Sequence, residues 1–337
     1  MKTRYEIDRE NAPASNPLGE RFQILALSGG GYRGLFTAAL LVELEKEGGP
    51  LRDRFDLITG TSIGSILAGA LSVGVPAADC LAGMLEHGER IFPPAGRIGK
   101  AARGAKQALI EAAYDTEPLQ EAIGEILGSQ CDEHLTNIEQ ALAIPCVSHT
   151  RAELRVLRSR GLAGSDANAV ALIDAMLASA AAPTYFPSRK LVTEVVIDGG
   201  LIANAPEMVG LGDAINLKGA KLADIHVLSI GTASASLARP PEEPPSSSIA
   251  GWMISRQLFQ VAMQAQEQMA QSQCQMLIGD NYLRLDGNPS PEQAEVLALD
   301  RADNVATETL LDLARACWGD REISVSNRIS EILRNNS

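Results

Sequence analysis

The stretch LALSGGGYRG, residues 25–34, runs from an apolar segment into three consecutive glycines and then into a helical pattern. A continuous apolar run of this length is typical of a strand that is buried on both faces of a parallel sheet. Gly29, Gly31 and Gly34 also fit the G-x-G-x-x-G spacing of dinucleotide-binding loops. The loop alone leaves two uses open: to bind a pyrophosphate, or to bind an oxygen that becomes negative only during a reaction.

Beyond this loop the chain repeats the order of strand and helix. The alternating segments are strand patterns at residues 21–29, 55–60, 143–149, 153–159, 191–197 and 225–230, and helical patterns at residues 35–47, 62–71, 76–90, 168–180 and 206–215. This alternation predicts an α/β protein with a mainly parallel central sheet flanked by helices. The C-terminal part favours helices, interrupted by a late strand at NYLRLD.

The domain organisation follows from the same pattern. We expect a flexible N-terminal arm at residues 1–20, a main domain at residues 21–290, and a helical extension at residues 291–337 that packs on that domain. The run RPPEEPPSSS at residues 239–248 fits neither a helix nor a central strand, so it is expected to be an exposed loop, either a lid or a plain solvent loop.

The bulk composition restricts the class of protein. A chain of 337 residues with 45% hydrophobic residues can bury a full core, and its formal net charge of -13 argues against general nucleic-acid binding. The five cysteines form no C-x-x-C pair, which favours free thiols in a reducing cytoplasm over a zinc site. Without a signal-peptide core or a sufficiently long apolar run, the chain is predicted to be cytoplasmic.

A second motif, Gly60-Thr61-Ser62-Ile63-Gly64, ends the second strand and opens an apolar helix. In a G-x-S-x-G turn the glycines permit the backbone to fold back sharply, which exposes the serine hydroxyl above the sheet edge. Ser62 is therefore a candidate nucleophile. The dinucleotide alternative needs an acidic residue at the end of this strand, whereas Asp56 lies at its beginning. The glycine loop and Ser62 instead follow two successive parallel strands, where loop N–H groups can stabilise an oxyanion.

A nucleophilic serine needs a base, and two candidates remain open. The chain order of Ser, Asp and His selects His226 for a triad, although it begins the strand IHVLSI instead of following a strand. Asp198 in VVIDGG ends a strand, and Gly199 and Gly200 let the chain turn away from it. Its carboxylate can face the same crevice as Ser62 and accept the hydroxyl proton directly.

The motifs GGGYRG, GTSIG and DGG, in this order, resemble the patatin-like phospholipase family, as do LASAAAPTYFPS (177–188) and HVLSIGTAS (226–234). The resemblance covers about residues 22–285. It implies a three-layer α/β sandwich and hydrolysis of lipid acyl esters by a Ser62–Asp198 dyad, without a catalytic histidine, metal or cofactor. It also implies an oxyanion hole from the backbone of Gly29, Gly30 and Gly31, supported by Arg33.

The stretches FQILALSGGGYRGLF and FDLITGTSIGSILA are similar to bacterial patatin-like effectors of cyclic-oligonucleotide anti-phage signalling (CBASS). This resemblance implies an activator such as a cyclic GMP-AMP, and membrane phospholipid as substrate at the inner face of the cell membrane. A homo-oligomer, and a non-catalytic nucleotide-binding module that uses the glycine loop, stay open. The candidate contacts to nucleotide phosphates or anionic headgroups form a basic stripe, with a solvated basic face as the alternative: Arg97, Lys100, Arg103 and Lys106.

Overall fold

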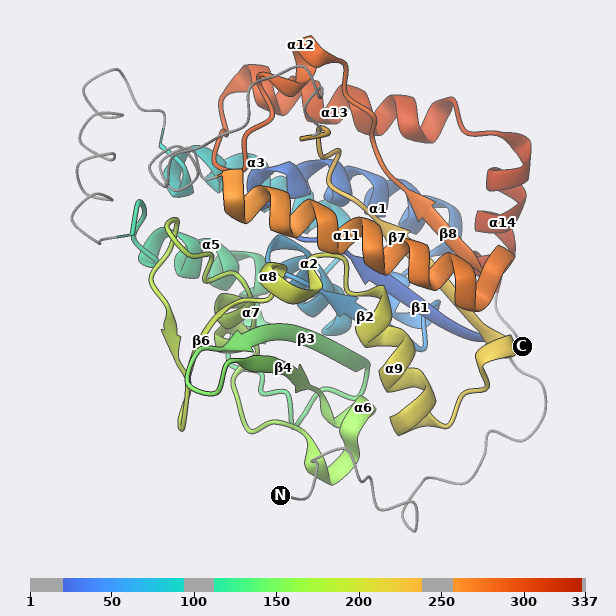
Figure 1. The fold of residues 1–337 in the computed structure, drawn as a ribbon, viewed down its shortest axis with the longest axis horizontal. Coiled ribbons are helices and arrows are strands. Elements are labelled where there is room, and N and C mark those ends of the chain that lie inside the picture. The colour runs from blue at the N-terminus through green and yellow to red at the C-terminus, as the bar shows by residue number, and fades with distance from the viewer. Residues whose placement is uncertain (1–20, 94–111, 238–256, 335–337) are drawn as a thin grey trace.

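The computed structural model describes residues 21–93, 112–237 and 257–334 (Figure 1). The expected N-terminal arm, the basic stripe (Arg97, Lys100, Arg103 and Lys106) and the loop at residues 239–248 lie outside the described residues.

The described part of the chain forms one central sheet in the order β5-β6-β3-β2-β1-β7-β8, with β4 paired to β3. Neighbours from β3 to β8 run parallel, whereas β4 and β6 are antiparallel to β3, and β5 is antiparallel to β6. The strands are β1 (Phe22–Leu27), β2 (Leu57–Gly60), β3 (Ala141–Ser148), β4 (Glu153–Arg158), β5 (Arg189–Lys190), β6 (Val195–Asp198), β7 (Ile225–Ile230) and β8 (Tyr282–Leu285). The predicted α/β class with a mainly parallel sheet is confirmed.

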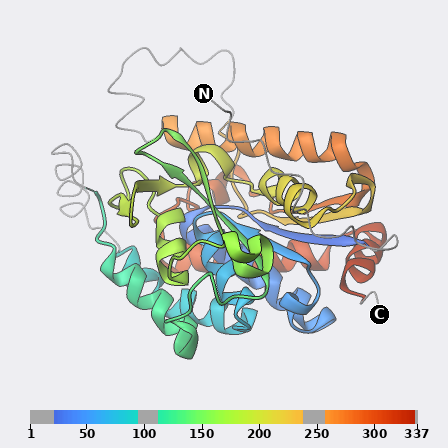
Figure 2. The ribbon, with the colours of Figure 1, turned by 90° about the horizontal axis from the view of Figure 1, so that it is seen from below.

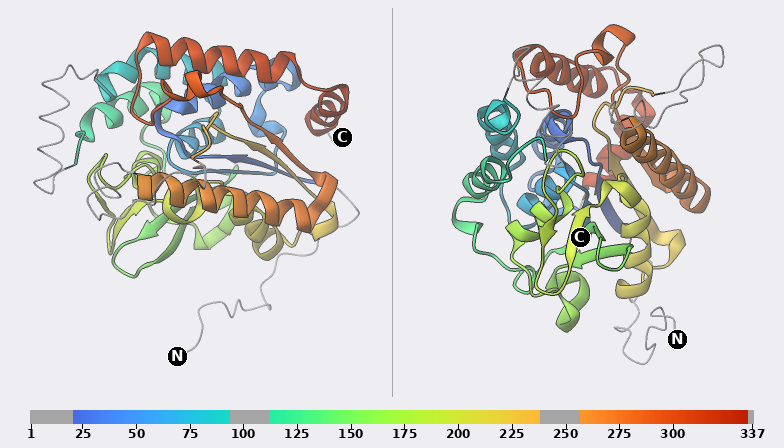
Figure 3. Two further views of the ribbon diagram at one scale, coloured as in Figure 1. Left: turned by 45° about the horizontal axis from the view of Figure 1, so that its top comes forward. Right: turned by 60° about the vertical axis from the view of Figure 1, so that its left-hand side comes forward.

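Helices cover both faces of this sheet (Figure 2). One face carries α1 (Gly34–Gly48), α2 (Ile63–Ser72), α3 (Ala77–Ile91), α5 (Glu117–Leu127), α7 (Leu172–Ser179), α13 (Asn304–Gly319) and α14 (Ile323–Leu333). The other carries α6 (Arg160–Ala163), α9 (Glu207–Lys218) and α11 (Gln257–Ile278). The short α8 (Gly200–Ala203) packs on α11, and α12 (Pro291–Ala294) precedes α13. In Figure 3, α11 and α13 lie on opposite sides of the sheet.

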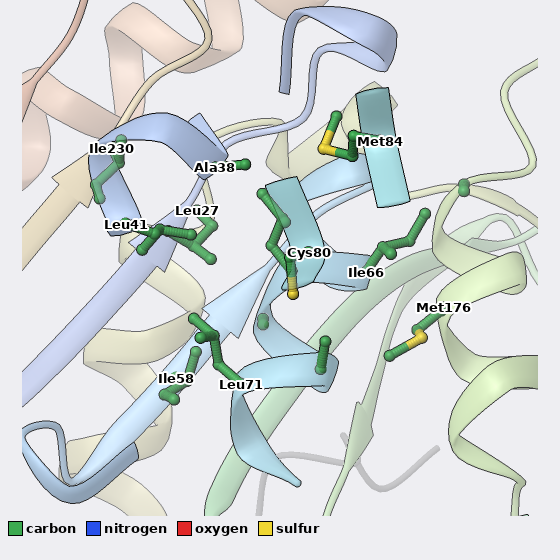
Figure 4. Close-up of a cluster of buried hydrophobic side chains, with 14 of the residues drawn as sticks. Leu27, Ala38, Leu41, Ile58, Ile66, Leu71, Cys80, Met84, Met176 and Ile230 are labelled. Atoms are coloured by element: carbon green, nitrogen blue, oxygen red, sulfur yellow. The ribbon is translucent and has the colours of Figure 1, made fainter. Parts of the chain in front are cut away.

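The apolar sequence of β1 explains these layers. Its residues are buried throughout, and they alternate between two hydrophobic clusters. Leu25 and Leu27 join the larger cluster, whereas Ile24 and Ala26 join the smaller one on the opposite face. Figure 4 shows Leu27 in the larger cluster with side chains from neighbouring strands and helices. A strand that must fill two cores reads as a continuous apolar run, and this is why the sequence showed no polar alternation.

The strand register brings the loops after β1, β2 and β7 to the same end of the sheet, where these parallel strands have their carboxyl ends. Leu27, the last residue of β1, pairs with Gly60 of β2 and with Ile230 of β7. The loops after these three strands therefore emerge together. Of the described helices, none is long and apolar enough to traverse a lipid bilayer.

The segment predicted as a strand at residues 191–197 differs from the structure. Residues 191–194 form the turn between β5 and β6, where the N–H of Leu191 donates to the carbonyl of Glu194 at 2.8 Å. β6 begins only at Val195, so a hairpin replaces the single strand.

Candidate active site

Ser62 lies at a strained turn between β2 and α2. Its backbone has φ 54° and ψ -125°, a region that a non-glycine residue adopts only when the surroundings enforce it. A Cβ on Gly60 would lie 2.0 Å from the carbonyl oxygen of Gly64, and a Cβ on Gly64 would lie 2.2 Å from that of Leu27. Both glycines of the G-x-S-x-G motif are therefore required by close backbone packing.

The glycine loop after β1 reaches the same edge. Gly31 has φ +58°, and a Cβ there would lie 2.2 Å from the carbonyl oxygen of Leu299. A Cβ on Gly30 would lie 2.4 Å from Thr232 Oγ1. The loop is fixed because the Tyr32 N–H donates to the Leu299 carbonyl at 2.8 Å. A segment far along the chain thus shapes the loop.

The N–H groups of the three glycines differ. That of Gly29 donates to the carbonyl oxygen of Asn204 at 2.9 Å and is already engaged. The N–H groups of Gly30 and Gly31 have no acceptor within the described part of the chain, and both residues line the same cavity as Ser62. Two donors, rather than the expected three, are available to a developing oxyanion.

Arg33 contacts this loop directly. Its Nε donates to the carbonyl oxygen of Gly30 at 3.4 Å, which accords with a supporting role. Burial lowers the pKa of the Arg33 guanidinium, and the carboxylates of Glu267 and Asp286 oppose that shift. The Arg33 guanidinium therefore lies against the carbonyl oxygen of Gly30 in the glycine loop.

Asp198 ends β6 and is 2% exposed. Burial raises the pKa of this carboxyl to about 7, while hydrogen bonds with the Gly200 N–H and the Ser62 side chain act to lower it. The Gly200 N–H donates to Asp198 Oδ1 at 2.6 Å. A Cβ on Gly199 would lie 2.3 Å from the carbonyl oxygen of Pro145, so this glycine lets β6 end tightly against β3. A carboxyl that titrates near neutrality beside a hydroxyl is suited to general-base chemistry.

A largely apolar cavity opens from this pair. Ser62 and Asp198 are among its lining residues. The apolar lining comes from α2, α3, α5 and α11, and includes Ile66, Met84, Leu119, Phe259 and Met263. A cavity of this character accepts a hydrocarbon chain and leaves few polar groups to orient it.

The structure excludes the proposed triad. His226 pairs with Gln23 near the beginning of β7, whereas Ile230 at the end of β7 is level with Leu27 and Gly60. Four residues of strand separate the two ends, or about 13 Å. The Ser62–Asp198–His226 alternative is therefore wrong, because His226 lies at the opposite edge of the sheet from Ser62.

The dinucleotide alternative also lacks its acidic partner. Asp56 lies before β2, at the edge away from the glycine loop, and its Oδ2 accepts the N–H of Gln23 at 2.7 Å. No group of His, Cys, Asp and Glu side chains among the described residues is arranged to hold a metal ion.

Comparison with known proteins agrees with this geometry. The family model for patatin-like phospholipases matches residues 25–211. This chain belongs to the patatin-like phospholipase family. The matched range contains the glycine loop, Ser62 and Asp198.

Curated relatives of this patatin-like chain include enzymes from three bacteria, each described as a cGAMP-activated phospholipase. That of Pseudomonas aeruginosa is 32% identical over 299 residues, covering 86% of this chain and 86% of the relative. That of Vibrio cholerae is 31% identical and covers 90% of this chain and 91% of the relative. That of Escherichia coli is 29% identical and covers 86% of both.

Two buried side chains of this patatin-like site were missed by sequence reasoning. The Asn204 side chain donates from Nδ2 to the carbonyl oxygen of Gly29 at 3.3 Å, while the backbone carbonyl of Asn204 accepts the Gly29 N–H. Ser179 Oγ accepts the N–H of Ser62 at 3.0 Å. Their signals were polar residues inside the motif-bearing stretches DGGLIANAP and LASAAAP, where an apolar residue would otherwise pack.

Proposed function

We propose that this chain hydrolyses fatty-acyl esters of membrane phospholipids, with Ser62 as nucleophile and Asp198 as base. The observation that supports this most is the Asp198 carboxyl, which is buried beside the nucleophile turn: burial raises its pKa to about 7, and a hydrogen bond with the Ser62 side chain opposes part of that rise. Gly30 and Gly31, whose N–H groups have no acceptor among the described residues, line the same apolar cavity as Ser62 and Asp198, so the proposed nucleophile, base and oxyanion donors adjoin the space for an acyl chain.

The reaction follows from these positions. Ser62 Oγ attacks the ester carbonyl carbon while ionised Asp198 removes its proton. The Gly30 and Gly31 N–H groups stabilise the oxyanion, at about 3 kcal/mol per donor in comparable sites. The intermediate collapses, and the leaving alcohol oxygen takes the proton from Asp198. Water then attacks the acyl-enzyme with Asp198 again as base, which releases the fatty acid and restores the Ser62 hydroxyl.

We propose in addition that a cyclic dinucleotide, such as a cyclic GMP-AMP, activates this hydrolysis as part of anti-phage defence. Support comes from three relatives that cover most of this chain and are described as cGAMP-activated phospholipases. The activated enzyme would act at the inner face of the cell membrane. Arg97, Lys100, Arg103 and Lys106 stay the candidate contacts for phosphate groups.

The test is mass spectrometry of phospholipid vesicles incubated with the purified full-length protein, with and without a panel of cyclic dinucleotides. Fatty acid and lysophospholipid should accumulate, and more so with one member of the panel. Ser62→Ala and Asp198→Ala should each reduce hydrolysis at least about 10³-fold. His226→Ala, on the opposite sheet edge, is the control and should retain wild-type activity. Equal loss in all three variants would contradict the dyad, and full activity that no cyclic dinucleotide increases would contradict activation.

A further inference from the structure

Ser179, the last residue of α7, connects the backbone on both sides of the candidate dyad. Its Oγ accepts the N–H of Ser62 at 3.0 Å and donates to the carbonyl oxygen of Pro145 at 2.6 Å. Its own carbonyl accepts the N–H of Gly199 at 3.3 Å. The side chain is fully buried, so these partners are not replaced by solvent.

These contacts matter because Ser62 stands at the beginning of α2. The first N–H groups of a helix have no acceptor within it, and a buried one without a partner is costly. Ser62 also has a positive φ, which relaxes unless the surroundings hold it. Ser179 Oγ supplies the acceptor for the Ser62 N–H and so opposes relaxation of the turn.

The other end of the bridge lies beside Asp198. Pro145 precedes Cys146, the residue of β3 that pairs with Asp198, and Gly199 follows Asp198 directly. The same segment continues to Ala181, whose carbonyl accepts the Asp198 N–H at 3.0 Å. Ser179 and Ala181 therefore fix the backbone of Asp198 while Ser179 fixes that of Ser62.

We propose that Ser179 is a positioning residue that sets the distance between the Ser62 hydroxyl and the Asp198 carboxyl through the Ser62 backbone. The inference rests on the proposed Ser62–Asp198 mechanism. Without its hydroxyl, Ser62 N–H loses its acceptor, the turn relaxes, and Oγ moves away from the base. A displacement of about 1 Å at a reacting atom lowers rates on the order of 100-fold.

Ser159, which bonds the backbone at the beginning of β3, offers a matched control. Ser159 Oγ accepts the N–H of Leu142 at 2.9 Å and donates to the carbonyl of Gln140 at 2.7 Å, and its side chain is also fully buried. Ser159 thus makes the same two kinds of hydrogen bond at the other end of β3. Replacing either serine with alanine removes equivalent structural bonds, but only Ser179 contacts the nucleophile turn.

The experiment measures the rate of Ser62 labelling by a fluorophosphonate from pH 5 to pH 9, with cyclic GMP-AMP present and absent. In this reaction Oγ displaces fluoride from phosphorus while Asp198 takes the proton, so the rate reports the pair without a membrane. Ser179→Ala should label about 10 to 100 times more slowly than wild type. Ser159→Ala should label at the wild-type rate. Thermal unfolding of both variants shows whether their folds are equally retained.

The position of the pH profile is the second readout. The hydrogen bond with Ser62 lowers the pKa of Asp198, so its loss in Ser179→Ala moves the acid limb to higher pH. The titratable group of β3 that couples to Asp198 is Cys146, and burial raises the pKa of its thiol to about 12, which keeps it neutral in this range. Ser179→Thr, which retains the hydroxyl, should recover part of the rate and return the limb toward its original position.

The outcomes separate the two proposals. If Ser62→Ala is still labelled at the wild-type rate, the proposed mechanism is wrong. A second outcome is that Ser62→Ala is not labelled, while Ser179→Ala and Ser159→Ala are labelled at the same rate and with the same pH profile. In that case the dyad stands and the positioning role of Ser179 is overturned.

Discussion

Asp198 of β6 pairs with Cys146 of β3, on the side of β3 that also pairs with β2 but beyond the point where β2 ends. β2 occupies that edge only as far as Thr59, which pairs with Ala143, and β6 then arrives antiparallel and fills the rest. β4 pairs along the opposite edge of β3. Two strands of opposite direction thus end near one another, and this places the carboxyl of Asp198 beside the turn that carries Ser62.

We expect the hydrolytic rate to rise with pH on a limb centred near 7. The base must be ionised, and burial raises the pKa of Asp198 to about 7. Below that pH the rate should fall about tenfold per unit. Initial rates on a soluble short-chain ester between pH 5 and pH 9 measure this pH dependence. Because no membrane is present, pH-dependent changes of a lipid surface do not contribute to the rates. His226→Ala should leave the limb in place, since His226 lies at the other sheet edge. A limb that disappears in that variant would assign it to the histidine instead.

Asp198→Asn should be inactive and yet more stable than wild type at pH 8. The folded-state pKa lies above the ordinary value of 3.8, so the folded chain binds the proton more tightly than the unfolded chain. This group's contribution to stability is therefore lost as pH rises from about 4 to about 7. The amide carries no charge and avoids that loss, a gain of about 1–4 kcal/mol. Urea unfolding at pH 5 and pH 8 should show a gap that widens with pH; a constant gap would contradict the buried-charge argument.

Gly30→Ala should abolish activity and lower the melting temperature. The added Cβ would lie 2.4 Å from Thr232 Oγ1, so the loop must move and its N–H groups leave the oxyanion position. Gly212→Ala in α9 is the control, since its Cβ would meet nothing within 4 Å. This substitution should keep activity and stabilise the helix by up to about 1 kcal/mol. Ester hydrolysis and thermal unfolding measure both effects. Retained activity in Gly30→Ala would remove this loop from the mechanism.

Two variants of Ser62, the proposed nucleophile, should both be inactive and should differ in stability. Ser62→Ala keeps a Cβ at φ 54°, whereas Ser62→Gly relieves the steric strain of that backbone. We expect Ser62→Gly to have a higher melting temperature than Ser62→Ala. The difference corresponds to about 1 kcal/mol or more in the free energy of unfolding. Equal melting temperatures would show that the turn stores no strain.

Much of the fold could be predicted from short-range patterns. The apolar run of β1, the glycines after it and the serine turn after β2 are local signals, and the structure has a strand, a turn and a helix in those places. The antiparallel pairing of β6 with β3 could not be predicted from the sequence, because it depends on which part of β3 is left unpaired by β2 and β4. The engaged N–H of Gly29 was missed for a similar reason: its acceptor, the carbonyl of Asn204, is distant in sequence.

The last quarter of the chain has a consequence for how this protein can be shortened. The family model ends at residue 211, but the carbonyl of Leu299 accepts the Tyr32 N–H, and the Tyr32 hydroxyl meets Thr307 Oγ1 at 2.8 Å. A truncation before residue 299 would retain every motif residue and still remove the hydrogen-bond partners of Tyr32 that hold the glycine loop. We therefore expect the shortest active fragment of this chain to extend well beyond the residues that the family model matches.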